Sequence, residues 1–420
     1  MDLKSRLMLI KKGEMRVRAP QHVSAREPPS GWNRAAAHVW ARTVDIPFAQ
    51  VPERFFPRLM RLENSGSANM ESSRGENAGD GSLALDRLAF FDLETTGLSG
   101  GSGTIAFLAT VAHFEGRDLI LSQTFMEDYP GEPDFLEMVC AQLAAVDWVV
   151  SYNGASFDLP LLQSRCVVNR IPPPLVRQID ILRDCRRFWA HRATSCTLGS
   201  MEELLLSKRR EEDIPSALVP RTWLDFVKAE TLRDEQRARL LLVWRHNLED
   251  VISLAEIFLL VESAYREPRS ALVRLAIDPG GLAANLLRLG RKLEAKSALI
   301  WVRDCPQDFE LSANVRMKAL RRLASMARRE RDRELYRQTV LSMDGDSIYG
   351  CIAKAKLYEH LEKDEGLALA WTLRARDILV GLDEGQEGVE PLKRAEWLEA
   401  IEHRRARLQK TLERRSGARP

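Results

Sequence analysis

The chain has 420 residues, of which 45% are hydrophobic and 29% charged, and its formal net charge at pH 7 is +2. This composition is typical of a globular protein with a sizeable core, and the length allows two or three domains. No apolar run approaches the length of a membrane span, and the apolar run near the N-terminus is too short for a signal peptide. Six scattered cysteines without a C-x-x-C pair predict reduced thiols, which excludes a disulfide framework and indicates a soluble, cytoplasmic protein.

The positive charge is concentrated at the two ends of the chain. Residues 1–42 contain nine Lys and Arg against three acids, and residues 404–420 contain seven against one. Each end therefore has a net charge of +6, and residues 43–403 have a net charge of −10. Basic ends can contact nucleic-acid phosphates, or they can be solvated tails, and the sequence leaves both interpretations open.

Sequence patterns divide the chain into four parts. Residues 1–82 predict a poorly ordered basic segment and linker, apart from a weak edge strand at 38–48. Residues 83–263 predict a compact α/β domain, residues 264–410 a helical domain, and residues 411–420 a basic tail.

From residue 83 onward, predicted strands and helices follow one another closely. The predicted strands are 88–93, 104–114, 118–126, 148–152 and 176–181. The predicted helices are 132–146, 157–169, 182–192, 197–206, 216–229 and 234–263. Three hairpin-like strands followed by alternating helix and strand indicate a mixed sheet flanked by helices. After Pro268 the chain is almost wholly helical, and residues 353–375 have the small-residue spacing of a tetratricopeptide unit, although a plain helical bundle is an alternative.

Two acids on the first predicted strand are candidate metal ligands. Asp92 and Glu94 end a buried apolar run, and side chains alternate along a strand, so both carboxylates lie on one face. Mg²⁺ or Mn²⁺ would relieve their repulsion, because these hard cations prefer oxygen ligands. A lone Asp-x-Glu pair is more often a solvated strand end. The loop at 99–103 lacks the Lys of a phosphate-binding loop, so it predicts a simple strand connection.

Two further acid positions follow along the chain. Asp158 opens a helix directly after an Asn153-Gly154 turn, where an acid also suits the helix dipole. His246 and Asp250 are four residues apart and share one face of the long predicted helix, as a solvated pair also would.

The order of these three positions resembles the DEDD exonucleases of the ribonuclease H-like superfamily and, more narrowly, the YprB family of predicted exonucleases. The resemblance covers residues 83–263 well, 264–410 loosely and 1–82 hardly at all. The matching stretches are Asp92 to Thr104, Ile179 to Leu182, Arg186 to Trp189, Leu198 to Glu203, and Arg209 with Asp213 to Pro215.

This resemblance implies a 3′–5′ exonuclease that hydrolyses phosphodiester bonds of DNA or RNA with two divalent cations, Mg²⁺ or Mn²⁺. The implied metal ligands are Asp92, Glu94, Asp158 and Asp250. The implied general base is His246, which lies four residues before the last acid, where the superfamily has Tyr; the position five residues before it, where other members have His, is Arg245.

The resemblance also implies substrate contacts around these acids. Backbone N–H groups of Thr95 and Thr96 and the apolar side chain of Leu98 would lie beside a terminal nucleotide, and Asn153 and Phe157 would line the path of the strand. Alternatively, Asn153 only turns the chain and Phe157 belongs to the core.

Two other functions remain open at this stage. The chain could be a nucleic-acid-binding or adaptor protein with a vestigial nuclease site, or an endonuclease on the same fold. The expected partners are single-stranded DNA or RNA and a protein bound by the helical domain, with no membrane.

Overall fold

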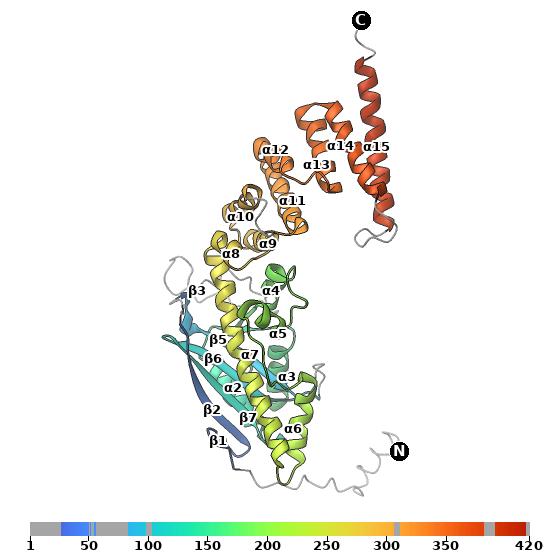
Figure 1. Cartoon of the computed structure of the whole chain (residues 1–420). Coiled ribbons are helices and arrows are strands. Elements are labelled where there is room, and N and C mark those ends of the chain that lie inside the picture. Colours follow the sequence, from blue (N-terminus) through green and yellow to red (C-terminus); the bar gives the residue numbers. More distant parts are fainter. Residues whose placement is uncertain are drawn as a thin grey trace, which may run out of the picture.

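The computed structural model describes residues 27–49, 51, 54–55, 83–97, 103–305, 311–381 and 391–416. A domain built on a seven-stranded mixed sheet is followed by an all-helical domain, and the two lie end to end (Figure 1). This arrangement confirms the predicted fold class. No helix among the described residues has the length and apolar character needed to cross a membrane.

The seven-stranded sheet has the order β1-β2-β7-β6-β5-β8-β9. Its strands are β1 (Asn33–Ala36), β2 (Val39–Pro47), β5 (Leu88–Thr95), β6 (Ala106–Glu115), β7 (Asp118–Met126), β8 (Trp148–Ser151) and β9 (Arg177–Asp180). Strands β1, β2, β7, β6 and β5 pair antiparallel, whereas β8 and β9 run parallel to β5. The carboxyl ends of β5, β8 and β9 therefore meet at one edge, where ligands usually bind in open α/β sheets.

The five strands predicted after residue 83 are confirmed, but the sheet begins earlier in the chain. Strand β2 corresponds to the predicted edge strand at 38–48, and β1 adds a further strand outside it. Val39 and Trp40 are buried in the core, so the described part of 1–82 is folded and the sheet extends beyond the predicted 83–263 range. A separate two-stranded antiparallel sheet pairs β3 (Arg54–Phe55) with β4 (Leu83–Ala84). Residues 1–26, most of the predicted linker and the loop at 98–102 lie outside the described residues.

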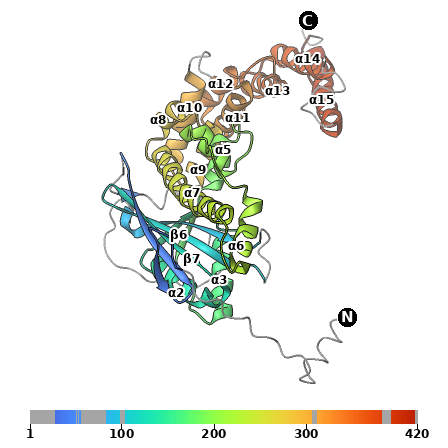
Figure 2. The same ribbon diagram turned by 60° about the horizontal axis from the view of Figure 1, so that its bottom comes forward.

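Helices cover both faces of the sheet. They are α2 (Glu132–Ala144), α3 (Asp158–Asn169), α4 (Leu182–Trp189), α5 (Leu198–Met201), α6 (Val219–Lys228) and α7 (Asp234–Arg266). Helix α7 lies across one face, and α2 and α3 lie on the other (Figure 2). Phe90 of β5 packs edge-to-face on Phe258 of α7, with ring centroids 5.4 Å apart. Because side chains alternate along β5, Asp92 and Glu94 share the α7 side of the sheet with Phe90.

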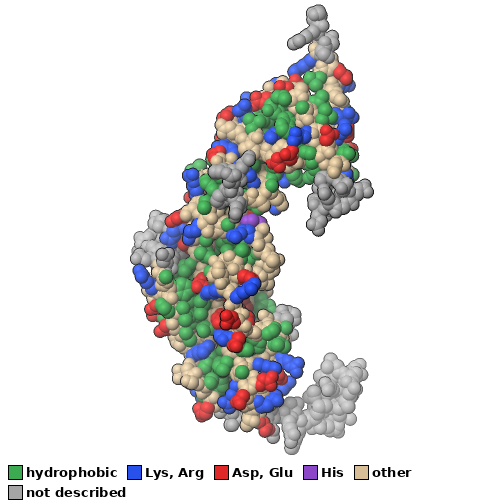
Figure 3. Space-filling model, in the orientation of Figure 1, with side chains coloured by type: hydrophobic (Ala, Val, Ile, Leu, Met, Phe, Trp, Pro, Cys, Tyr) green, Lys and Arg blue, Asp and Glu red, His purple; other side chains and the backbone are tan. Residues whose placement is uncertain are grey.

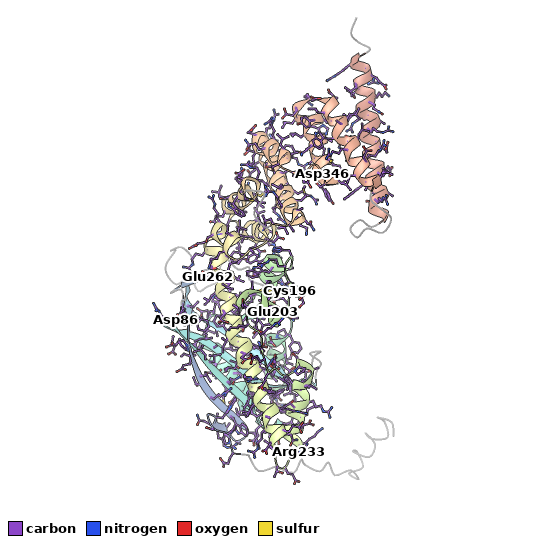
Figure 4. The ribbon with its side chains drawn as sticks, in the orientation of Figure 1. Asp86, Cys196, Glu203, Arg233, Glu262 and Asp346 are labelled. Atoms are coloured by element: carbon purple, nitrogen blue, oxygen red, sulfur yellow. The ribbon has the colours of Figure 1, made fainter. Side chains whose placement is uncertain are left out.

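Helix α7 has 33 residues and connects the two domains. Arg233 directly before it and Glu262 near its end mark its two ends in Figure 4. Asn247, Val251 and Leu254 recur at helical spacing and are at most 1% exposed, so this face of α7 packs on the sheet.

The helical domain consists of stacked helix pairs. Its helices are α8 (Pro268–Arg274), α9 (Pro279–Arg288), α10 (Lys292–Asp304), α11 (Ala313–Glu330), α12 (Arg333–Leu341), α13 (Ile348–Leu357), α14 (Glu365–Gly381) and α15 (Pro391–Ser416). Helices α9 and α10, α11 and α12, and α13 and α14 pack as neighbouring pairs, and α15 packs on α14.

Helix α15 continues to Ser416, so residues 411–416 of the predicted basic tail are helical. Arg404 and Arg407 both bind Glu359, and Arg415 binds Glu365. The basic residues at this end of the chain therefore tie α15 to the rest of the helical domain.

The joint between the domains is a continuous core with a buried polar network. One hydrophobic cluster extends from β5 through α7 to Leu335 of α12. Within the joint, Asn285 of α9 donates hydrogen bonds to Asp184 of α4 at 2.7 Å and to Tyr265 of α7 at 2.6 Å. Arg187 donates to the amide oxygen of Asn285 at 2.6 Å. Because these polar groups satisfy one another away from water, they favour one relative position of α4, α7 and α9.

Replacing Gly281 with Ala should destabilise this joint. A Cβ atom at Gly281 would lie 2.0 Å from the backbone oxygen of Arg187, so α9 would have to move away from α4. We expect a loss of about 1–3 kcal/mol, the usual cost of overpacking, seen as a lower melting temperature in calorimetry. Gly366→Ala is the matched control, because its Cβ meets only the Asp364 side chain at 3.4 Å. Equal melting temperatures for the two variants would contradict the tight contact at the joint.

Candidate active site

The candidate site lies at the carboxyl end of β5. Asp92 and Glu94 lie on the same strand, two residues apart, and the ladder to β6 is irregular between Glu94 and Thr95. Irregularities of this kind often occur beside active sites, because they end the pairing and re-aim side chains. The side chain of Glu94 is only 14% exposed.

Asp158 reaches the site from the turn after β8. It is 6% exposed and occupies the first position of α3. A Cβ atom on Gly154 would lie 2.7 Å from Asp158 Oδ2 and 2.6 Å from the Ser151 side chain. Gly154 is therefore required for the close packing around this carboxylate.

Asp180 at the end of β9 holds the same turn in place. Its Oδ1 atom accepts hydrogen bonds from the backbone N–H groups of Asn153 at 2.9 Å and Leu182 at 3.1 Å. Asn153 has a left-handed φ of 67°, which Asn tolerates better than most residues. Asp180 thus fixes the turn that presents Asp158.

His246 and Asp250 reach the site from helix α7, which lies over the sheet face that carries Asp92 and Glu94. His246 Nε2 lies 3.6 Å from Asp250 Oδ2 and 4.0 Å from Glu94 Oε1. One ligand atom each from Glu94, His246 and Asp250 lie within 4.8 Å of one another. Arg245 does not share this position, because it is 44% exposed and donates to the backbone oxygen of Glu212.

The imidazole of His246 is oriented by Asp213. Asp213 Oδ1 lies 2.7 Å from Nδ1 of His246, and an ionised carboxylate can only accept a hydrogen bond. The guanidinium of Arg210 lies 3.0 Å from the same Nδ1, and the other ring nitrogen, Nε2, lies on the side of Glu94 and Asp250.

The four carboxylates of the site repel one another in a poorly solvated environment. Burial, followed by the charges of Asp250, Asp158 and Glu94, raises the pKa of Asp92 well above its usual value. Burial and the charges of Asp250, Asp158 and Asp213 do the same to the pKa of Glu94. Burial and Asp180 raise the pKa of Asp158 to about 7. Burial also raises the pKa of Asp250, although the charges of His246 and Arg210 oppose this shift. Such a cluster is a typical functional-site signature.

Arg210 is a cation of this site that the sequence did not identify. It is 13% exposed and donates hydrogen bonds to Asp250 and Glu202, and it lies 3.0 Å from His246 Nδ1. Burial lowers the pKa of its guanidinium, but Asp250 and Glu202 outweigh burial and raise that pKa. The neighbouring Arg209, which belongs to the matching stretches, is 84% exposed and binds only Glu203 among the described residues. Acidic and basic side chains are interspersed over the middle of this domain in Figure 3.

Asn247 orients Asp92 from beneath the site. It is fully buried, and its Nδ2 donates to Asp92 Oδ2 at 2.7 Å. Its amide oxygen accepts from Thr110 and, at 3.3 Å, from Gln123. Gln123 in turn accepts a 2.8 Å hydrogen bond from Arg42 of β2. These hydrogen bonds link four adjacent strands of the sheet, β2, β7, β6 and β5, so Asp92 is held by residues far apart in the sequence.

The expected substrate contacts are placed as follows. Thr95 is buried and its hydroxyl donates to the backbone oxygen of Gly97 at 2.8 Å. The backbone N–H of Thr96 donates to Ile105 at 2.9 Å, so it is not available to a nucleotide as expected. Asn153 is exposed at the turn before α3, and Phe157 is half-buried at the start of α3. Leu98 lies outside the described residues.

The donor set suits a hard divalent cation. Closely spaced carboxylates with raised pKa values are stabilised in their ionised form when a cation joins them, and carboxylate oxygens are the ligands that Mg²⁺ and Mn²⁺ prefer. All six cysteines are free thiols, and none belongs to this site.

Part of the chain is similar to known proteins. Residues 89–261 match the model of the RNase H superfamily. The chain is 32% identical over 198 residues to the uncharacterized protein YprB of Bacillus subtilis strain 168; the match covers 46% of this chain and 45% of YprB. A family B DNA polymerase from Pyrobaculum calidifontis is 18% identical, with a TM-score of 0.31, over 48% of this chain and 29% of the polymerase.

The sheet domain is thus an RNase H-like nuclease fold, in a class of proteins that usually use divalent metal ions. Over part of its length the chain is also similar to YprB, and the match spans less than half of that protein.

The stability of the metal-free protein should depend on pH through Asp158. Its folded pKa of about 7 exceeds the unfolded value of about 3.9, so folding binds a proton between these values. This contribution to stability is fully present below about pH 4 and is lost as the pH rises through 7. We therefore expect Asp158→Asn to gain melting temperature relative to the parent in EDTA as the pH is raised from about 4 to 7. A difference that does not change with pH would contradict the burial of this carboxylate.

Proposed function

We propose that the chain is a metal-dependent 3′–5′ exonuclease that hydrolyses phosphodiester bonds of DNA or RNA. The observation that carries this proposal is the meeting of four carboxylates from three elements, beside His246, at the carboxyl end of β5 in an RNase H-like fold. The direction of digestion rests on the resemblance to the DEDD exonucleases.

Asp92, Glu94, Asp158 and Asp250 would hold two divalent cations, Mg²⁺ or Mn²⁺. When bound, such ions supply Lewis-acid stabilisation of the charge that develops on the scissile phosphate and on the attacking and leaving oxygens. Asn247 orients Asp92, and Asp180 orients the turn that carries Asp158. Both residues therefore act by positioning the proposed metal ligands.

His246 is the proposed general base. Its Nε2 atom lies 3.6 Å from Asp250 Oδ2 and 4.0 Å from Glu94 Oε1, so a neutral imidazole that carries its proton on Nδ1 would accept the proton of an attacking water bound there. Asp213 is a positioning residue, since it fixes the ring and stabilises the imidazolium that forms. Arg210 donates to Asp250 Oδ1 and favours the ionised form of this carboxylate, whereas Asp250 Oδ2 lies 3.6 Å from His246 Nε2.

We propose that Asn153 and Phe157, with Leu98, line the path of the strand end. We further propose that the helical domain is a tetratricopeptide-like region, that it can also bind a protein partner, and that the chain works in the cytoplasm. An endonuclease would give different products in the same assay, and a binding protein with an inactive site would give none.

Asp250→Asn should abolish hydrolysis, because it removes a carboxylate from the site while leaving a side chain of the same shape. Parent and variant are incubated with 5′-labelled single-stranded DNA and RNA in Mn²⁺ or EDTA. We expect a ladder that shortens from the 3′ end only with the parent and Mn²⁺. Equal activity of the variant would contradict the assignment of Asp250. Discrete internal cuts would indicate an endonuclease, and binding without products would indicate a binding protein.

The role of His246 is tested by two substitutions. His246→Ala should lower kcat by about 10²–10⁴-fold, the usual contribution of a general base. His246→Tyr should retain activity, since Tyr is the superfamily residue at this spacing. A loss for His246→Tyr as deep as that for Asp250→Asn would mean that the imidazole is irreplaceable. Full activity of His246→Ala would exclude it as the base.

A further inference from the structure

A basic groove lies at the joint between the two domains, where α4, α9 and α11 follow one another (Figure 1). Its volume is about 850 Å³. Seven Lys and Arg, one His and one acid line it: Arg186, Arg187, Arg288, Lys318, Arg321, Arg322, Arg329, His191 and Asp278. This concentration of positive charge occurs in a chain whose net charge is only +2.

Helix α11 presents a regular row of polar and basic side chains to the groove. Lys318, Arg322, Ser325 and Arg329 recur at spacings of four, three and four, which places them on one helix face. The three basic residues are exposed, and none forms an ion pair with another residue of the described chain.

The basic groups are close enough to oppose one another. Burial, followed by the charge of Arg288, lowers the pKa of Arg187. Asp278 caps the start of α9. Its Oδ1 accepts hydrogen bonds from the backbone N–H groups of Gly280 at 2.7 Å and Gly281 at 3.1 Å. A bound polyanion would relieve this repulsion.

A second hollow of about 500 Å³ adjoins the groove and shares Arg321 and Ser325 with it. Its lining includes the aromatic residues Tyr336, Tyr349 and Trp397. The guanidinium of Arg321 lies 3.8 Å from the centroid of Tyr349, which is 40% exposed. Basic side chains next to accessible aromatic rings are typical of surfaces that bind unpaired bases and their phosphates.

Helix α4 links the groove to the candidate active site. Asp180, which holds the turn before Asp158, precedes α4, and Arg186 and Arg187 lie on its last turn. The helix has eight residues and therefore spans about 12 Å. The buried network at the joint keeps this separation fixed.

We propose that the basic groove binds the sugar–phosphate backbone of a single-stranded nucleic acid and that the adjoining hollow stacks its bases. This inference rests on the proposed function only in one respect, namely that the bound strand is the one whose 3′ end reaches the active site. A single strand fits better than a duplex, because the aromatic rings can stack only on unpaired bases. In this proposal the helical domain supplies the contacts that bind long substrates.

The test measures binding without cleavage. All variants carry Asp250→Asn and are studied in EDTA with fluorescent oligonucleotides of about four and about twenty nucleotides, lengths that bracket usual single-strand sites. Lys318→Gln with Arg322→Gln should weaken binding of the longer strand by at least about tenfold and flatten the slope of log K against log salt by about 1.4. The shorter strand should show a much smaller difference.

The matched control is Arg237→Gln with Arg333→Gln, which removes the same charge from exposed positions outside the groove. This control should leave both affinity and slope unchanged. An equal slope for the groove and control variants would overturn the proposal. Competition by polyglutamate as strong as by an oligonucleotide of equal charge would assign the groove to an acidic protein and would also overturn it. Hydrolysis by the parent is measured separately, so failure of the groove and failure of the nuclease proposal are distinguishable.

Discussion

The structure of the candidate site depends on the mutual repulsion of carboxylates in a poorly solvated place. Asp92, Glu94, Asp158 and Asp250 each have a raised pKa, and burial is the leading cause for all four. A fold that only required stability would replace such a cluster with apolar residues. A divalent cation bound between the carboxylates would offset their repulsion with its positive charge. The arrangement is therefore unfavourable without a cation and favourable for binding one.

The surrounding residues keep this strained cluster in one geometry. Asn247 donates to Asp92, Arg210 donates to Asp250, and Asp213 holds the ring of His246. These partners come from α7 and from the segment between α5 and α6, and they converge on an edge that the parallel strands define. The same edge leads through α4 to the joint with the helical domain, so one short element connects the candidate active site with the proposed binding groove.

Much of this site could be predicted from local patterns. Strand alternation places Asp92 and Glu94 on one face, and helical spacing places His246 and Asp250 on one face. The resemblance to a known family then joined these local pairs into one constellation. The strands after residue 83 were predicted correctly because their apolar runs and turn signals are strong.

The remaining features depend on contacts between distant segments. Arg210 and Asn247 carry no local signal, because their roles arise only when α7 packs on the sheet. Strand β1 and the continuation of α15 were missed for a related reason. A basic or weakly periodic segment resembles a tail when its partners are unknown. In the structure, Arg415 forms an ion pair with Glu365, and Trp32 packs against Trp244. The basic groove is assembled from α4, α9 and α11, and α4 lies more than a hundred residues before α11 in the sequence, so composition alone had placed the positive charge at the chain ends.

The most direct test of the central claim is to count the Mn²⁺ ions that the metal-free protein binds. The signal of free Mn²⁺ in electron paramagnetic resonance falls as the ion is bound, and the titration is done above pH 7, where Asp158 is ionised. We expect about two ions per chain for the parent and a loss of tight binding for Asp92→Ala. Binding curves that are the same for parent and Asp92→Ala would contradict a metal site built on these carboxylates.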